Sequence, residues 1–428
     1  MEIALRPEVP TYAGGLGILA GDMLRSAADL GVPIVGVTLV YRKGYFRQRL
    51  DSQGNQQEEP VIWKPEEVLE PLTSVVSLEL AGRRVQIRAW RFTLTGVSGA
   101  MVPVYLLDTD LPENDPADRS LTDYWYGGDP SYRLHQEAIL GMGGVEMLNS
   151  LGHNEIENYH LNEGHSALLT LALLEQKIGT SRLGTASEAD IESVRQHCVF
   201  TTHTPVPAAF DKFPRELVNQ VIGPDRAAVL DVTACCPDNM LNMTYLALRF
   251  SRYINGVAMH HGEVSRGLFP NYPVRAITNG VHAVTWASQE FRELYDRHVP
   301  EWRKDNLYLR YVVGVPLEEI RQAHAGAKLA LLNELKKATG CEFDPAVLTI
   351  AFARRAAAYK RADLLFTDLE RLKSIAGHVG PLQVIFGGKA HPQDGEGKEM
   401  IRRVFQAAHS LEGSVNVVYV PDYGMRWA

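Results

Sequence analysis

Apolar and polar positions follow two regular patterns in the first quarter of this chain. Residues 31–40 (GVPIVGVTLV) and 101–107 are nearly continuous apolar runs, which is typical of strands buried on both faces. Between residues 76 and 92, apolar and polar side chains alternate on either side of Ala81 and Gly82. That alternation predicts a half-exposed hairpin inserted on the main sheet.

Farther along, helical spacing of apolar side chains predominates. The pattern predicts helices at residues 133–152, 166–176, 240–253, 285–295 and 317–337, and strands at residues 156–161 and 198–202. The helix at 317–337 is the clearest, because it is long and rich in Ala, Leu, Glu and Lys.

From Leu348 onward the pattern favours a βαβαβ series. Strands are predicted at residues 348–353, 382–386 and 415–420, with helices at residues 362–375 and 397–410. Such a series implies a parallel sheet with right-handed crossovers. Only residues 421–428 follow the last strand, whereas a doubly wound domain continues for several more strands. We therefore expect two domains, residues 1–278 and 279–428, the second of them incomplete.

Composition places the chain among globular proteins. Its 428 residues are 45% hydrophobic and 22% charged, with a net charge of −8, which argues against general affinity for nucleic acid or an anionic membrane. Any anion site must therefore be local. The four cysteines have neither metal-ligand spacing nor the density of a disulfide scaffold. No signal peptide or membrane-spanning run is apparent, so a cytoplasmic location is expected.

A glycine-rich turn, TYAGGLGILAGD at residues 11–22, leads directly into an amphipathic helical stretch. Glycine lets backbone N–H groups approach a ligand closely, and a helix N-terminus adds a positive dipole end, so the unit could hold a phosphate. An ordinary turn before a helix is the alternative interpretation.

Polar residues follow several of the predicted strands. Asn162, Glu163 and His165 follow one strand, His203 and Thr204 follow the next, and Asn279 follows a later apolar stretch. Because ligands bind beyond the carboxyl ends of parallel strands, these residues are candidates for a binding wall. Each could instead close a turn or cap a helix.

The strongest cluster of charge is ARRAAAYKR at residues 353–361, which places four cations between a strand end and a helix start. Cations there oppose the helix dipole by about 0.3–1 kcal/mol each, whereas a phosphate would reverse the sign. The alternatives are a solvated basic face or pairing with carboxylates. Lys389 in GGK has a similar setting and could instead pair with Asp394 or Glu396.

Taken together, the motifs resemble one family, the α-glucan (glycogen, starch and maltodextrin) phosphorylases, in particular their short bacterial and archaeal branch. The matching segments are YAGGLGILAGD, YRLHQE, LNEGHSA, TTHTPVP, NGVA, ITNGVHAVTW, ARRAAAYKR and GGKAHP, in the family's order from near the first residue to the last. So many ordered matches are far more specific than any one motif.

The resemblance implies an α/β fold of two facing Rossmann-like domains, of the glycosyltransferase-B type, with the second domain truncated. It implies phosphorolysis of terminal α-1,4-linked glucose by inorganic phosphate to give glucose 1-phosphate. The implied cofactor is pyridoxal phosphate, whose phosphate group acts as general acid and base. The implied partners are glucan and inorganic phosphate, and the implied assembly is a homo-oligomer.

Roles are carried over by position. Arg355 and Lys360 resemble the residues that hold the substrate phosphate, while Arg354 and the glycines Gly14 and Gly15, through the Gly15 N–H, resemble contacts to the cofactor phosphate. The remaining matches concern the sugar: Tyr359, His203, Asn279, Leu16, Thr204, Glu163, His165 and, near the gate, Asp129.

The chain departs from the family in several places. Arg354, Glu163 and Thr202 stand where longer members have lysine, aspartate and asparagine. The SGTxxMK-type segment with the lysine that forms the Schiff base has no counterpart before Ala428. A partial phosphorylase, active or inactive, is therefore the first hypothesis. A nucleotide-sugar glycosyltransferase and a non-catalytic glucan-binding protein are the alternatives.

Overall fold

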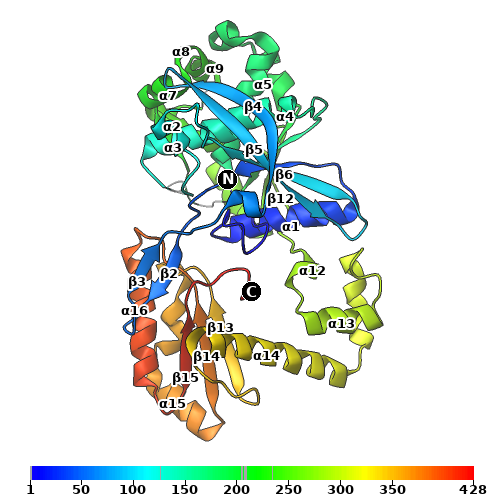
Figure 1. Ribbon diagram of the computed structural model, residues 1–428, viewed down its shortest axis with the longest axis vertical. Helices are drawn as coiled ribbons and strands as arrows, with labels where there is room; N and C mark the ends of the chain where they lie inside the picture. The colour runs from blue at the N-terminus through cyan, green and yellow to red at the C-terminus, as the bar shows by residue number, and fades with distance from the viewer. Residues whose placement is uncertain (1, 126, 204–205, 207–209, 234) are drawn as a thin grey trace. The chain divides into compact units, whose positions relative to one another are not determined.

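The computed structural model describes residues 2–125, 127–203, 206, 210–233 and 235–428, which form two compact units (Figure 1). The first unit contains residues 1–45 and 62–281, and the second contains residues 46–61 and 282–428. Close to residue 278, the predicted domain boundary, the chain passes from one unit to the other at residue 281. Residues 46–61, which the sequence analysis placed in the N-terminal domain, belong to the second unit.

One sheet of the first unit has the strand order β1 (Gly36–Leu39), β6 (Met101–Asp108), β5 (Arg83–Thr95) and β4 (Glu70–Leu80). The pair β1 and β6 is parallel, and the remaining pairs are antiparallel. Helix α1 (Gly15–Leu30) packs its apolar side chains on this sheet. The predicted hairpin is confirmed: it consists of β4 and β5, and β5 pairs with β6, so the hairpin extends the sheet on that side.

The other main sheet of this unit is parallel throughout, in the order β12 (Val274–Ala276), β11 (Tyr253–Gly256), β8 (Cys198–Thr202) and β7 (Tyr159–Asn162). All four strands therefore end at the same edge. The predicted helix over residues 240–253 is wrong at both ends. A short strand, β10 (Met240–Asn242), comes first, and α10 (Met243–Arg249) follows because the Asn242 side chain accepts the amides of Thr244 and Tyr245.

The predicted helix at residues 133–152 consists of α3 (Pro130–Ala138), a π-helical turn (Ile139–Gly143) and α4 (Gly144–Ser150). The turn lies against the start of α5 (Leu169–Ile178), where a Cβ on Gly141 would lie 2.6 Å from the Leu169 nitrogen. The other elements of the unit are α2 (Pro116–Arg119), α6 (Glu188–Arg195), β9 (Lys212–Pro214), α7 (Arg215–Ile222), α8 (Pro224–Ala227), α9 (Val229–Thr233) and α11 (Met259–Leu268).

The second unit contains the predicted parallel sheet, in the order β13 (Leu348–Ala353), β14 (Leu382–Gly387) and β15 (Asn416–Val420). Successive side chains alternate between its faces. Val384 and Phe386 pack with α15 (Leu369–His378) and α16 (Gly395–Ser410), whereas Ile385 and Val418 pack with α14 (Leu317–Thr339). The βαβαβ prediction is confirmed, except that residues 362–366 of the predicted helix at 362–375 form a 3₁₀ turn and the α-helix begins at Leu369.

The second unit also contains two short helices and a hairpin. Helices α12 (Ala283–Trp286) and α13 (Gln289–His298) precede α14 (Figure 1). A hairpin of β2 (Arg47–Leu50) and β3 (Gln56–Glu59) also belongs here. In the part of the chain that is described, no helix is both long and apolar enough to cross a bilayer.

Candidate functional site

The basic segment begins where β13 ends. Arg354 and Arg355 are exposed, and η8 (Ala358–Lys360) follows as a single turn. Arg355 Nη2 lies 3.4 Å from the Tyr359 hydroxyl, and Lys360 Nζ lies 4.6 Å from the centre of the Tyr359 ring. Among described residues no carboxylate forms an ion pair with Arg354, Arg355 or Lys360. The pairing alternative from the sequence is therefore not what this structure shows.

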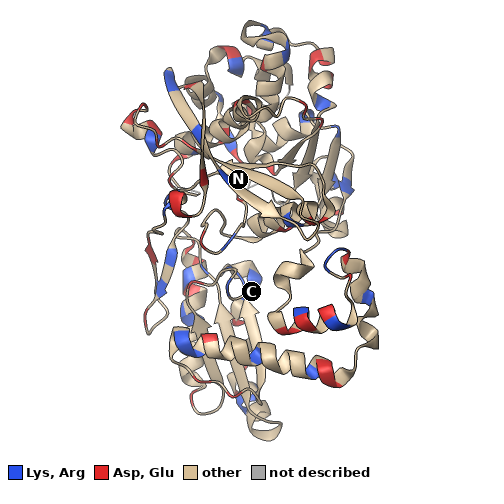
Figure 2. Ribbon diagram, turned by 45° about the vertical axis from the view of Figure 1, so that its right-hand side comes forward, with Lys and Arg blue, Asp and Glu red and all other residues tan. Residues whose placement is uncertain are grey.

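These uncompensated cations affect Tyr359. Burial raises the pKa of its phenol, but the guanidinium of Arg355 and the ammonium of Lys360 outweigh that effect and lower it. Lysines and arginines are otherwise interspersed with acidic residues in both units (Figure 2). A local anion would find positive charge here that no carboxylate of the described residues compensates.

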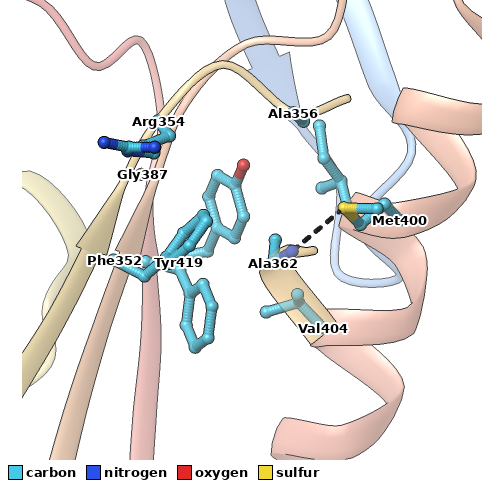
Figure 3. A pocket seen from close by; sticks show the side chains of 10 residues that line it. Phe352, Arg354, Ala356, Ala362, Gly387, Met400, Val404 and Tyr419 are labelled. Atoms are coloured by element: carbon cyan, nitrogen blue, oxygen red, sulfur yellow. Dashed lines mark hydrogen bonds between the residues drawn. The ribbon is translucent and has the colours of Figure 1, made fainter. Parts of the chain in front are cut away.

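A small pocket lies at the ends of β13, β14 and β15 in the second unit (Figure 3). Its lining is mainly apolar and includes Phe352, Tyr419, Met400 and Val404. The guanidinium of Arg354 points away from these side chains (Figure 3). The pocket is thus part of the packing that supports the strand ends, and Arg354 is directed outward from it.

The glycines of the turn at residues 11–22 differ in the space around them. A Cβ on Gly17 would lie 2.7 Å from the Tyr12 Cβ, and one on Gly21 would lie 2.1 Å from the Ala4 carbonyl oxygen, so these two glycines permit close packing of residues 2–5 on α1. A Cβ on Gly15 would meet no atom within 4 Å. Only the start of the turn is therefore open to a ligand.

Glu2 occupies part of this turn. Its Oε2 accepts the amides of Ala13 at 2.7 Å and Gly14 at 3.1 Å, although burial raises the pKa of this carboxyl. Among the described residues nothing accepts the Gly15 amide. Of the two glycines expected to contact a cofactor phosphate, Gly15 thus keeps its amide available while the Gly14 amide is engaged.

At the carboxyl edge of the parallel sheet in the first unit, the structure brings Glu163 and His203 together. Glu163 has a positive φ of 68°, a strained conformation for a side chain other than glycine. Its Oε2 accepts the His203 amide at 2.8 Å, and His203 Nε2 lies 2.5 Å from Asn162 Oδ1. Asn162 and Glu163 therefore fix both the backbone and the ring of His203.

His165 lies in a neighbouring cluster that sequence reasoning did not identify. Its Nε2 is 3.4 Å from Asp211 Oδ2, and Arg133 Nη2 is 2.7 Å from Asp211 Oδ1 and 3.6 Å from Glu137 Oε1. Burial and the nearby Asp211 charge raise the pKa of Glu137 well above its usual range. One guanidinium thus faces two carboxyl groups, and burial together with the Asp211 charge disfavours the ionised form of Glu137.

The remaining predicted residues lie less close together. Asn279 is exposed, and its amide donates to the Val257 carbonyl. Asp129 Oδ1 accepts the Tyr132 amide at 2.8 Å and so caps α3. Leu16 is half-buried in the first turn of α1, and Thr204 lies outside the described residues. Their proposed contacts with sugar stay predictions.

Burial lowers the pKa of His203 to about 4, and the nearby His261 and His160 act in the same direction. An unfolded histidine keeps its pKa near 6.5, so the unfolded chain binds more protons between these values. We expect the free energy of unfolding to fall as pH falls from 6.5 to 4, with His203 contributing about 2 kcal/mol after allowance for its partial solvent access.

Denaturant titrations across pH 4–8 would measure this contribution. His203→Asn should show a shallower acid loss, whereas the exposed His324→Asn should follow the wild type. Equal slopes for wild type and His203→Asn would contradict the assignment.

The known proteins to which this chain is similar belong to the family that its motifs resemble. A family model described as carbohydrate phosphorylase matches residues 7–81 and 222–428. Maltodextrin phosphorylase of Thermococcus litoralis is 36% identical over 99% of this chain and 54% of its own length. Glycogen phosphorylase of Mycobacterium tuberculosis is 35% identical over 100% of this chain and 55% of its own length. That of Aquifex aeolicus is 32% identical over 99% and 66%. The chain spans about half the length of the first two.

Proposed function

Since the chain belongs to the carbohydrate phosphorylase family, we propose that it provides part of an α-glucan phosphorylase. The reaction is attack of inorganic phosphate on the terminal α-1,4-linked glucose of a glycogen or maltodextrin chain, which yields glucose 1-phosphate. The observation that carries this proposal is the group of cations after β13, none of which is paired with a carboxylate in the described part of the chain. The names of the matched relatives agree with it.

In this proposal Arg355 and Lys360 bind the substrate phosphate. A guanidinium offers two parallel N–H donors to phosphate oxygens, and an ammonium adds a compact charge. Tyr359, held between the two, presents its ring and hydroxyl to the sugar. Fixed cations also stabilise the negative charge of phosphate as the glycosidic bond breaks, which is the usual electrostatic contribution to such a transition state.

The sugar contacts are assigned to the first unit. With the Asn162 amide oxygen facing Nε2, the His203 ring carries its proton on Nε2 and offers Nδ1 as an acceptor for a hydroxyl. The lowered pKa of His203 keeps the ring neutral at physiological pH. Asn279, Glu163 and His165 complete the proposed set of polar groups, with Leu16, Thr204 and Asp129 beside them.

The cofactor assigned to this family is pyridoxal phosphate, and the residues present suit its phosphate. The Gly15 amide stands at the start of a 16-residue helix, where a Cβ on Gly15 would meet no atom within 4 Å, and a helix N-terminus is a favourable place for an anion. Arg354 is the cation that the family resemblance assigns to the same phosphate. When bound, the cofactor contributes a phosphate group that acts as general acid and base. Lys389 is not assigned to the cofactor in this proposal; its Nζ contacts Asp422 and the Phe46 carbonyl.

Further parts of the proposal concern the whole protein. The mixed α/β architecture with parallel sheets is present. The arrangement as two Rossmann-like domains of glycosyltransferase-B type, the homo-oligomer and the cytoplasmic location follow from the family resemblance and belong to the proposal.

Calorimetric titration of the chain with inorganic phosphate and with maltoheptaose tests the function. We expect both to bind, and phosphate binding to weaken as salt is raised, because the contacts are ionic. Binding of uridine diphosphoglucose without phosphate binding would instead support a nucleotide-sugar glycosyltransferase. Binding of maltoheptaose alone would support a non-catalytic glucan-binding protein.

A further inference from the structure

We propose that the β2–β3 hairpin is a strap that positions the basic segment, with Gln48 and Gln56 as the positioning residues. This inference rests on the proposed function for its consequence, phosphate affinity, and on the second unit alone for its geometry. The hairpin, the turn at residues 387–390 and the start of the basic segment all belong to that unit.

Two glutamines attach the hairpin to this turn. Both are buried, at 2% and 8% exposure, on one face of the hairpin. Gln56 forms a paired contact with one residue, since its Nε2 donates to the Ala390 carbonyl at 2.9 Å and its Oε1 accepts the Ala390 amide at 2.9 Å. Gln48 Nε2 donates to the Gly388 carbonyl at 3.0 Å and to Gln56 Oε1 at 2.9 Å.

The opposite side of the same turn is bonded to the basic segment. The Arg354 amide donates to the Gly387 carbonyl, and the Ala356 amide donates to the Lys389 carbonyl, each at 3.0 Å. Gly388 has a φ of 141°, and a Cβ there would lie 1.8 Å from the Arg354 carbonyl oxygen. The turn is thus held between the glutamines and the backbone that carries Arg354 and Arg355.

Ionic contacts strengthen the attachment. Lys389 Nζ lies 2.5 Å from Asp422 Oδ1, and Lys398 Nζ lies 2.8 Å from Glu58 Oε1. Asp422 and Gln48 exchange two further hydrogen bonds through their amides and side chains. Loss of Gln56 would remove the partners of the buried Ala390 amide and carbonyl, which costs more than the loss of an exposed hydrogen bond. Loss of Gln48 would be milder at the turn, because the Gly388 carbonyl also accepts the Tyr419 hydroxyl at 2.8 Å.

The test compares Gln56→Met with Gln57→Met in the full chain. Gln57 is the next residue and is exposed, so its variant is a matched control. In hydrogen exchange followed by mass spectrometry, we expect Gln56→Met to speed exchange about tenfold in residues 354–361 and 388–391. Exchange in α14, which lies outside this network, should stay as in the wild type, and so should every region of Gln57→Met.

Phosphate titration of the same samples separates the two proposals. Gln56→Met should weaken inorganic phosphate binding about tenfold while its melting transition stays cooperative. Should the variant unfold, Gln48→Met provides the second test, because it removes the Gly388 contact and leaves the Ala390 pair intact. Unchanged exchange in residues 354–361 in a folded variant would overturn the strap. Faster exchange in a chain whose wild type binds no phosphate would overturn the proposed function and leave the strap standing.

Discussion

Replacing Arg355 by alanine is expected to weaken inorganic phosphate binding about 100-fold. The change removes a guanidinium that has no carboxylate partner among the described residues, so its charge is available to an anion. A charge-assisted, two-point contact with phosphate is worth about 2–3 kcal/mol, which corresponds to a factor of about 100. Calorimetry at constant ionic strength would measure the affinity.

The fold should not depend on Arg355. Its side chain is exposed and contacts the Tyr359 hydroxyl at 3.4 Å, so the free energy of unfolding should change by no more than about 0.5 kcal/mol. Arg371→Ala, an exposed arginine on α15 of the same unit, is the control and should bind phosphate as the wild type does. Arg355→Lys should recover part of the affinity, since it restores charge but not the planar fork. Equal phosphate affinities for Arg355→Ala and Arg371→Ala would remove Arg355 from the proposed site.

The local pattern of apolar residues was sufficient to predict the bounds of strands that are rich in apolar side chains. The strand predicted at residues 348–353 coincides with β13, and the one at 198–202 coincides with β8. The four-residue strand β11 was missed because its apolar content is slight, and it forms only because β8 and β12 flank it on both sides. Tertiary pairing, rather than local propensity, decides such a segment.

The hairpin at residues 47–59 shows a second reason for failure. Its buried side chains are glutamines, so the segment has no apolar alternation to reveal it. What fixes it is hydrogen bonding to residues 334 to 374 positions away. The same reason hides Asp211, whose partner Arg133 is 78 positions distant. Sequence motifs identified the residues at strand ends. The polar groups that position those residues are distant in sequence and become apparent only in the folded structure.

Two glycines of the opening turn are expected to respond in opposite ways to alanine. Gly21→Ala places a Cβ 2.1 Å from the Ala4 carbonyl oxygen, a backbone atom that must move. Residues 2–5 could then no longer pack closely on α1. Such overpacking against backbone should cost about 3 kcal/mol or more. Gly15→Ala meets nothing within 4 Å at the first position of α1, and alanine favours helix over glycine by up to about 1 kcal/mol. Thermal unfolding should rank Gly15→Ala at or above the wild type and Gly21→Ala well below it.

Binding should single out Gly15 nonetheless. A methyl group on this residue would add bulk next to the Gly15 amide, in space that is otherwise open around the Cβ position, so a phosphate would approach that N–H less closely. We expect Gly15→Ala to bind pyridoxal phosphate about tenfold more weakly in a calorimetric titration, despite its undiminished stability. Gly99→Ala is unsuitable as a control because its φ is 81°, whereas Gly267→Ala adds a Cβ in equally open space on α11 and should leave binding unchanged. Wild-type affinity in Gly15→Ala would show that this amide does not hold the cofactor phosphate, whatever the cations of the second unit do.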